Sequence, residues 1–413
     1  MSQASTMLRT MVDTGNGSLR SLRESNRERL LGLLQENGVL HRAELARRAG
    51  VSRTTVSTIV ADLLDEGIVV EVGDDTDRYA AVDDVERKGS RPRTGLSLNP
   101  KAGAVIGLDF SADAVVGVVA DLGHEVLAEE SHDLGAELPW ENRLDVGVDL
   151  AKTLLARADM PWSRVVGVGL GVPGPVDQRT GEVGASSRSL PWAGAHAASD
   201  LSRRLNVPVS MDNTAHLGAL AEIAWGVAQG CRNVIYVKIS SGLSAGLVVD
   251  GRVFGGAIGA TGALGHMPVD LDGPVCPCGS RGCLELYAAV PALVAQLQGM
   301  SRDLTIGHIL SMVDDGHRAA RRVLADAAGT LGRVLAGVCN LLNPELVVIG
   351  GDLAAAGEHY LAPLESTLLD HALPIVADQL RVVPGQLGDR AGALGAVACV
   401  LREATPLRST STT

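Results

Sequence analysis

Aromatic residues are scarce in this chain of 413 residues. It has 2 phenylalanines, 4 tryptophans and 4 tyrosines against 49 glycines, although 46% of its residues are hydrophobic. Its core must therefore be built mainly from alanine, valine, leucine and isoleucine, with glycine between them, which is typical of an α/β protein. At this length two or three domains are expected.

Long apolar runs are missing as well. No stretch reaches the about 18–20 residues that a membrane span needs, and the N-terminus has no continuous apolar core of a secretion signal. Six cysteines in a chain of this length, three of them within one short segment, do not form a disulfide framework. We therefore expect a cytoplasmic protein with no membrane partner.

Negative charge dominates the chain but is unevenly spread. The net charge is −12, which by itself argues against a nucleic-acid partner. Residues 1–60 nevertheless hold nine arginines against five acidic residues, a local balance of +4. Only this N-terminal part is suited electrostatically to phosphate groups.

The N-terminal part has the pattern of a winged helix-turn-helix. A helix from Ser25 to about Asn37, a short helix ending at Gly50 and a third helix after Ser52 are followed by strand-like runs at 68–73 and 91–99. Small polar side chains and arginines at the start of the third helix and near the wing are suited to DNA. The predicted DNA-binding residues are Arg42, Ser52, Arg53, Thr54, Thr55, Ser57, Thr58, Arg91 and Arg93. A small helical packing module is the alternative.

The segment 265–285, GHMPVDLDGPVCPCGSRGCLE, predicts a metal site. It places His266, Cys276, Cys278 and Cys283 within eighteen residues. One imidazole and three thiolates form a closed tetrahedral donor set, which a structural zinc ion prefers. Three buried small side chains and a hydrogen-bonded histidine would be the alternative.

The same segment resembles the ROK family, which unites two-lobed sugar kinases with transcription regulators built on the same body. CPCGSRGCLE (276–285) matches the family's C-x-C-G-x-x-G-C-x-E signature. Further matches are GVPGPVD (171–177), GHM (265–267) and NLLNPELVVIGGDLAAAG (340–357), and the resemblance covers roughly 100–404.

The resemblance implies an α/β body with two lobes of the actin-like, ribonuclease-H-like fold. Strands are expected at 104–110, 114–121, 165–172, 232–240, 244–254 and 344–352, and helices at 216–225, 288–298, 317–342 and 391–403. The expected organisation is a flexible arm at 1–22, the DNA-binding domain at 23–98, the body at 99–404 with a zinc loop at 262–285, and a flexible tail at 405–413.

The nucleotide half of the expected cleft departs from the family's kinases. Their D-x-G-G-T-K loop reads Asp-Phe-Ser-Ala-Asp-Ala at 109–114, and their G-T-G-x-G-G-G loop reads Ser-Ser-Gly-Leu-Ser-Ala-Gly at 240–246. The motif E-N-D-A-N, whose Asp is the kinases' general base, aligns with residues 212–216 and places Thr214 at the base position. A shift by one alignment step would instead give Asp212 that role. We expect no kinase activity, because a threonine hydroxyl accepts no proton near neutral pH.

The sugar half is retained in part. By resemblance, Gly174, Asn213, His266 and Glu285 would contact a sugar, with the second nitrogen of His266 on the zinc ion. Ala263 stands where the family has a sugar-binding glutamate. A carbohydrate or a sugar phosphate is the expected ligand.

The sequence thus predicts a DNA-binding transcription regulator, as a homodimer or homotetramer, whose degenerate kinase body senses a carbohydrate. A repressor is expected. The alternatives are a sugar kinase that also regulates, and a repressor that responds to a protein partner without any sugar.

Overall fold

A computed structural model describes residues 22–23, 25–34, 37–72, 94–135, 137–184, 191–300 and 304–403. Its backbone divides into two compact units. One unit consists of residues 1–104 with 121–125 and 403–413, and the other of 105–120 with 126–402. The predicted arm and tail lie outside the described residues, except for Leu22, and the predicted domain boundaries stay predictions.

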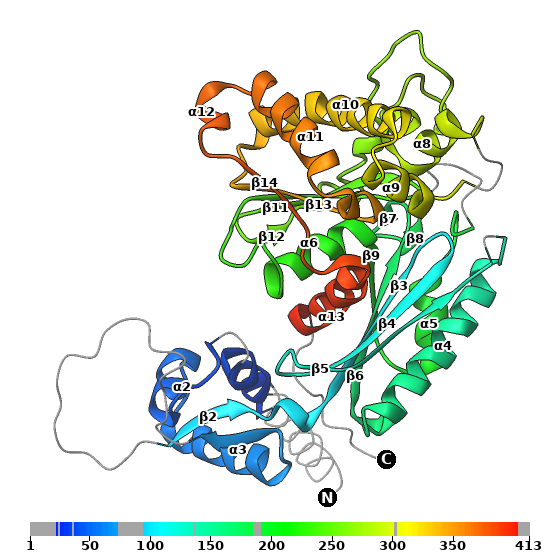
Figure 1. Cartoon of the computed structure of the whole chain (residues 1–413). Coiled ribbons are helices and arrows are strands. Elements are labelled where there is room, and N and C mark those ends of the chain that lie inside the picture. The colour runs from blue at the N-terminus through cyan, green and yellow to red at the C-terminus, as the bar shows by residue number, and fades with distance from the viewer. Residues whose placement is uncertain are drawn as a thin grey trace, which may run out of the picture. The chain divides into compact units, whose positions relative to one another are not determined.

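The N-terminal unit contains the predicted three helices and a two-stranded wing (Figure 1). Residues 25–34 are helical, and α2 (Arg42–Ala49) and α3 (Arg53–Asp65) follow. Strands β1 (Val69–Val72) and β2 (Gly95–Leu98) pair in antiparallel register from Val69–Leu98 to Val72–Gly95. Leucines and other aliphatic residues from all three helices and both strands form one core.

The first lobe of the larger unit is a five-stranded sheet in the order β5-β4-β3-β6-β9. Helices α4 and α5 lie on one side of this sheet in Figure 1. The elements are β3 (Ala104–Phe110), β4 (Ala114–Asp121), β5 (Val126–Asp133), α4 (Trp140–Arg157), β6 (Val165–Val172), α5 (Ala197–Leu205) and β9 (Val209–Asn213). A small ribbon of β7 (Val176–Asp177) and β8 (Glu182–Val183) follows β6.

The second lobe has a sheet of the same size in the order β12-β11-β10-β13-β14. Helix α6 (Thr214–Ala224) packs against β10 and β11, and α10 and α11 lie across the other face (Figure 1). The strands are β10 (Val234–Ile239), β11 (Leu243–Val249), β12 (Arg252–Val253), β13 (Leu346–Gly350) and β14 (Arg381–Pro384). The helices are α7 (Glu285–Ala288), α8 (Val290–Leu297), α9 (Ile306–Asp314), α10 (Arg318–Leu342), α11 (Glu358–His371) and α12 (Pro374–Ala377). The last helix, α13 (Ala391–Glu403), packs against α6 and against the sheet of the first lobe.

Glycines let two central helices approach their neighbours through the backbone. A Cβ added at Gly395 of α13 would lie 1.8 Å from the carbonyl oxygen of Leu217 in α6. A Cβ added at Gly107 of β3 would lie 2.0 Å from the carbonyl oxygen of Ala393 in α13. A Cβ added at Gly246 of β11 would lie 2.3 Å from the carbonyl oxygen of Ala215 in α6. Helices α6 and α13 therefore contact each other, and each contacts a sheet, at distances too short for a side chain at these glycine positions.

Most of the predicted elements are present, with differences at their ends. The strands predicted at 104–110, 114–121 and 165–172 coincide with β3, β4 and β6. The run 244–254 forms two strands, because a turn with positive φ at Asp250 and Gly251 interrupts it. The helix expected at 288–298 begins after the short α7, since extended backbone at Ala289 separates α7 from α8.

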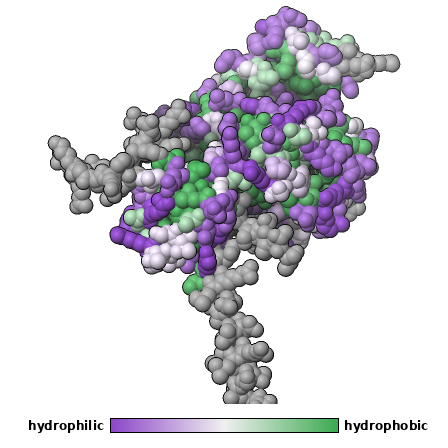
Figure 2. Space-filling view, turned by 90° about the horizontal axis from the view of Figure 1, so that it is seen from below, coloured by the Kyte–Doolittle hydropathy of each residue, from purple (hydrophilic) through white to green (hydrophobic). Residues whose placement is uncertain are grey.

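None of the described helices is long and apolar enough to cross a membrane. On the face drawn in Figure 2, hydrophobic and hydrophilic residues are interspersed.

Replacement of Gly395 by alanine should destabilise the larger unit. A side chain there overlaps the Leu217 carbonyl, and overpacking of this kind costs about 1–3 kcal/mol of unfolding free energy. Gly337→Ala is the matched control, because Gly337 is an exposed position of helix α10 with nothing within 4 Å. Its alanine should be neutral or stabilising by up to about 1 kcal/mol. Equal effects of the two changes in denaturant titrations would contradict the close helix contact.

Candidate functional site

A cavity of about 360 Å³ lies where strands of both sheets of the larger unit end. Its wall includes residues that directly follow β3, β6, β9 and β10, and residues of the loop after β12. Ligands of open α/β sheets bind beyond the carboxyl ends of the strands. The wall segments are 110–112, 173–175, 213–214, 240–244 and 260–263.

All four residues predicted to contact a ligand line this cavity: Gly174, Asn213, His266 and Glu285. They come from segments up to 111 residues apart in the sequence, from the loop after β6 to the start of α7. The structure therefore brings them together, although their role in binding stays a prediction. Ala263 also lines the cavity, so its wall carries a methyl group where the family has a carboxylate.

Asn213 joins two parts of the cavity wall. Its side-chain amide donates a hydrogen bond to the carbonyl oxygen of Gly174 at 2.7 Å, and its Oδ1 accepts one from the backbone N–H of Ala215 at 2.8 Å. The second bond caps the N-terminus of α6. Gly174 has a φ of 96°, a conformation that favours glycine. The two hydrogen bonds of Asn213 thus connect the bend after β6 to the first turn of α6.

His266 and Glu285 stand at the two ends of the cysteine-rich segment, and both line the cavity. The Oε2 of Glu285 accepts a hydrogen bond from the N–H of Leu243 at 3.1 Å, which ties α7 to the start of β11. A carboxylate has further acceptor positions, so this contact does not exhaust it. The short 3₁₀ turn Leu264–His266 places His266 at the wall of the cavity.

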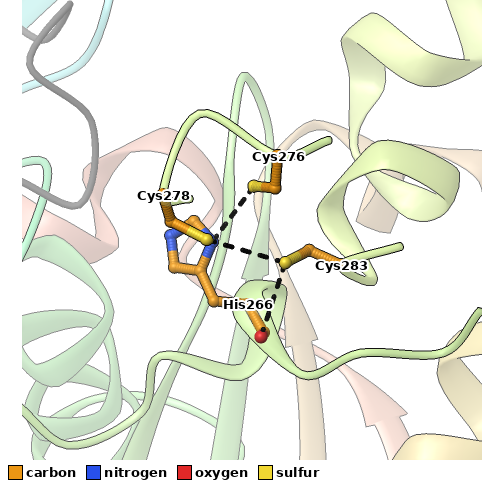
Figure 3. Close-up of side chains that lie close together, drawn as sticks. All are labelled: His266, Cys276, Cys278 and Cys283. Carbon is orange, nitrogen blue, oxygen red and sulfur yellow. Dashed lines mark hydrogen bonds between the residues drawn. The ribbon is translucent and has the colours of Figure 1, made fainter. Parts of the chain in front are cut away.

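The imidazole of His266 and the thiols of Cys276, Cys278 and Cys283 point toward one another (Figure 3). Their ligand atoms all lie within 4.8 Å of one another. Nδ1 of His266 lies 3.7 Å from the Sγ of Cys276, and the Sγ atoms of Cys278 and Cys283 are also 3.7 Å apart. With metal–sulfur bonds of about 2.3 Å, a tetrahedral ion holds its sulfur atoms about 3.8 Å apart. The four residues therefore fit a tetrahedral metal ion.

The chemistry of the thiols also fits a cation. Burial raises the pKa of the Cys276 thiol, and it raises that of Cys283 to about 12. Both thiols would be neutral near pH 7 without a partner, whereas a metal ion binds them as thiolates and compensates the buried charge. The sequence prediction that these four residues form a possible metal-binding cluster is therefore confirmed.

Beside the cavity, near the end of β3, lies an ion pair that the sequence did not reveal. Lys238 of β10 lies 3.4 Å from the Oδ2 of Asp109 of β3, so the pair joins the two sheets. Asp109 is 4% exposed, and burial raises its pKa although Lys238 opposes the shift. Lys238 itself lines the cavity.

The β3–β4 hairpin loop is bound by protein groups. Arg143 of α4 is fully buried and donates hydrogen bonds to the carbonyl oxygens of Ser111 and Ala112 at 3.2 and 2.9 Å. The Ser111 hydroxyl is 3.1 Å from a carboxylate oxygen of Asp113 and accepts a hydrogen bond from the N–H of Ala114 at 2.9 Å. The loop's polar groups thus satisfy one another.

Acidic residues gather on this side. Burial raises the pKa of the Asp352 carboxyl, a hydrogen bond from Ser240 opposes the shift, and the nearby charges of Asp389 and Asp113 add to it. The charge of Lys238, which lines the cavity, opposes the shift as well.

Thr214 faces the cavity, whereas Asp212 is not among the described residues that line it. The Oδ1 of Asp212 instead lies 2.9 Å from Nδ1 of His216 and accepts a hydrogen bond from the N–H of Asn213 at 2.7 Å. Sequence spacing alone predicts neither the contact of Asp212 with His216 nor that of Asp109 with Lys238.

In the N-terminal unit, α3 presents a short polar surface. Ser52 caps the helix by accepting a hydrogen bond from the N–H of Thr55 at 3.1 Å. Arg53, Thr54, Ser57 and Thr58 are exposed. Val56, Ile59, Val60 and Leu63 are buried on the opposite face, and Leu64 is half-buried. Gly50, with a φ of 68°, forms the turn between α2 and α3.

The remaining predicted DNA-binding residues have different surroundings. Arg42 forms an ion pair of 2.8 Å with Glu71 of the wing strand β1, so its charge is shared within the domain. The Thr55 hydroxyl lies 2.8 Å from that of Ser52. Arg91 and Arg93 lie outside the described residues.

Together these features define a two-lobed kinase-type body preceded by a winged helix-turn-helix. Residues 105–403 match the ROK family, and residues 23–70 match a winged helix-turn-helix DNA-binding family. The chain therefore belongs to the ROK family, as its sequence motifs predicted.

The chain is similar both to transcription repressors and to sugar kinases. The chain is 28% identical to a xylose repressor of Bacillus spizizenii over 92% of its own length and 96% of the relative's. It is 29% identical to a glucokinase of Thermotoga maritima over 72% of its length and 96% of the relative's. A ROK family transcriptional regulator described as a homologue of the Escherichia coli Mlc protein superimposes with a TM-score of 0.73 at 25% identity, over 93% and 96% of the two chains.

Proposed function

We propose that this protein is a DNA-binding transcription regulator, a repressor, whose kinase-type cavity binds a carbohydrate without phosphorylating it. The observation that carries the proposal is the combination of the two halves in one chain. The winged helix-turn-helix precedes the body, and the alignment with the xylose repressor spans 92% of the chain, whereas that with the glucokinase spans 72%. A regulator of this kind acts on chromosomal DNA, in the cytoplasm of a bacterium.

Helix α3 is the proposed reading helix. Its exposed Arg53, Thr54, Ser57 and Thr58 would contact base edges and phosphates in the major groove. Ser52 and Thr55 would act mainly through the helix cap, and Arg42 would contact phosphate from its place beside Glu71. A homodimer or homotetramer is proposed, because paired half-sites require two reading helices.

Loss of kinase chemistry is supported by three contacts. Lys238 of the cavity wall pairs with the buried Asp109, and Arg143 binds carbonyl groups of the hairpin loop. Asp212, the second candidate for a general base, is engaged by His216. Thr214 remains at the cavity wall, and its hydroxyl cannot take a proton from a sugar near neutral pH.

The sugar half offers hydrogen-bonding groups in a space of suitable size. About 360 Å³ lies within the range of small-molecule sites, about 300–1,000 Å³. We propose that Gly174, Asn213, His266 and Glu285 contact the sugar hydroxyls, with D-xylose and D-glucose as the first candidates because relatives are named for them.

The metal ion is proposed to be zinc, held by His266, Cys276, Cys278 and Cys283. Zinc would fix the loop between Gly265 and Glu285, and a metal bond to Nδ1 of His266 would leave Nε2 for the ligand. Zinc thus would have a structural role and no part in a reaction.

Removal of zinc should destabilise the protein. We expect the purified chain to carry one zinc ion by elemental analysis, and Cys283→Ser to lose it together with about 3–5 kcal/mol of unfolding free energy. Cys231→Ser is the control, because Cys231 is a half-buried cysteine outside the cluster. Retention of zinc and stability by Cys283→Ser would show that these residues hold no structural metal.

Replacement of Arg53 should weaken DNA binding. Arg53→Ala should lower affinity for an operator fragment, selected from genomic DNA, by about 1–3 kcal/mol at constant salt. Arg322→Ala, which removes an exposed arginine of helix α10, should leave affinity unchanged. Fluorescence anisotropy measures both variants, and an unaltered affinity of Arg53→Ala would mean that α3 does not dock as proposed.

A ligand should be detectable by thermal unfolding of the zinc-replete protein. The set includes D-xylose, D-glucose, amino sugars, their phosphates and Mg-ATP. A ligand at about 100 times its dissociation constant adds about 2.7 kcal/mol to stability. We expect a shift with one carbohydrate and none with Mg-ATP. Stabilisation by Mg-ATP together with sugar-dependent release of ADP would identify a kinase instead.

A further inference from the structure

His216 is a buried histidine of α6 to which neither the family motifs nor the cavity assigns a role. Its side chain is 1% exposed, one turn beyond the Asn213 cap. Nδ1 lies 2.9 Å from Oδ1 of Asp212, at the end of β9. Nε2 lies 3.1 Å from the carbonyl oxygen of Thr261 and 3.3 Å from its hydroxyl.

The protonation state of His216 follows from the groups around it. The Thr261 hydroxyl donates its own hydrogen to the carbonyl oxygen of Phe254, so it can only accept from Nε2. The carbonyl of Thr261 is an acceptor as well, and so is the Asp212 carboxylate. Both ring nitrogens therefore face acceptors, and only the imidazolium, with a hydrogen on each nitrogen, satisfies all of them.

Thr261 belongs to the loop after β12, residues 254–263, whose last four residues line the cavity. This loop is also close to β11, because a Cβ at Gly262 would lie 1.8 Å from the carbonyl oxygen of Ala245. On its other side, His216 lies on the helix that begins with the cavity residues Asn213 and Thr214. The ring thus connects two walls of the cavity from behind.

We propose that His216 is a positioning residue whose imidazolium fastens the loop 254–263 to α6 and β9, so that the order of the cavity wall depends on pH. The proposal deepens the proposed function, since the cavity is the ligand site named there. Loss of one proton removes one of the two charged contacts and leaves a ring nitrogen lone pair facing an oxygen.

The charges around α6 support this assignment. Asp212 is the charged group in contact with His216, and the loop 254–263 contains no titratable residue. The pKa of His216 is raised overall: burial lowers it, but the hydrogen bond and charge of Asp212 and the carbonyl of Thr261 outweigh burial. Other titratable residues of α6 and the elements packed against it are Glu222, Tyr236, Lys238, Arg252, Cys399, Arg402 and Glu403.

Two of these groups are engaged elsewhere. Lys238 pairs with Asp109, and Glu222 accepts hydrogen bonds from the backbone N–H groups of Val227, Gln386 and Leu387.

The direction of the pH effect follows from the raised pKa. The contact contributes fully below the unfolded-state value of about 6.5, and its contribution is lost as pH rises through the folded value. The loop should therefore be most ordered in mildly acidic solution and loosen as the solution becomes alkaline.

Hydrogen exchange of the full, zinc-replete chain tests the proposal without any ligand. After correction for the intrinsic pH dependence of exchange, amides of residues 254–263 should exchange about 10-fold faster at about pH 9 than at about pH 6, as expected for the loss of a charged hydrogen bond. In His216→Gln, exchange should be fast at both values, because the single amide nitrogen of glutamine replaces only one of the two ring nitrogens and its oxygen would face an acceptor. His359→Gln, at an exposed position of α11, should behave as the wild type.

Exchange of the loop that is independent of pH in the wild type would overturn the proposal, whether or not the variant folds. Nitrogen-15 resonances of the histidine rings give a second measurement on the wild type: both nitrogens of His216 should be protonated at pH 6, and a neutral ring there would overturn the proposal. D-xylose binding is measured separately, so an absent sugar response counts against the proposed function and not against the role of His216.

Discussion

Backbone contact between α6 and α13 is the constraint on which the body depends. Gly395 lets α13 approach the Leu217 carbonyl of α6, while Gly107 and Gly246 bring these helices against a sheet of each lobe. Interiors are packed as densely as crystals, so larger residues at these contacts would force the helices apart. The many glycines and few aromatic residues of the chain reflect this close packing rather than flexibility.

Helix α6 transmits that constraint to the cavity. Its first residues, Asn213 and Thr214, lie in the wall, and its fixed position defines where they stand. Around it the cleft is asymmetric. On the side of the β3–β4 loop, Lys238 pairs with Asp109 and Arg143 binds carbonyl groups of the loop, whereas the other side has hydrogen-bonding groups beside the cysteine cluster. We propose that a body with this asymmetry binds a sugar and does not transfer a phosphoryl group.

The sequence predicted the fold class, most strands and the cluster of His266 with three cysteines, because periodicity and short-range spacing encode them. It also predicted the four cavity residues, but only through family motifs that carry information about distant contacts. The contacts of Lys238 with Asp109 and of His216 with Thr261 were missed, since each joins residues 45 or more positions apart in the sequence. The contact of His216 with Asp212 was missed because it depends on the position of the neighbouring strand. The element ends at Ala289 and Asp250 were missed because local backbone geometry decides them.

The central claim is that a carbohydrate in the cavity controls DNA binding. The most direct measurement is the affinity of the full-length, zinc-replete protein for a selected operator fragment, with and without a saturating sugar at constant salt. The account predicts a change of about 5- to 150-fold, the usual range of coupling between two sites. An operator affinity that no sugar alters would contradict it.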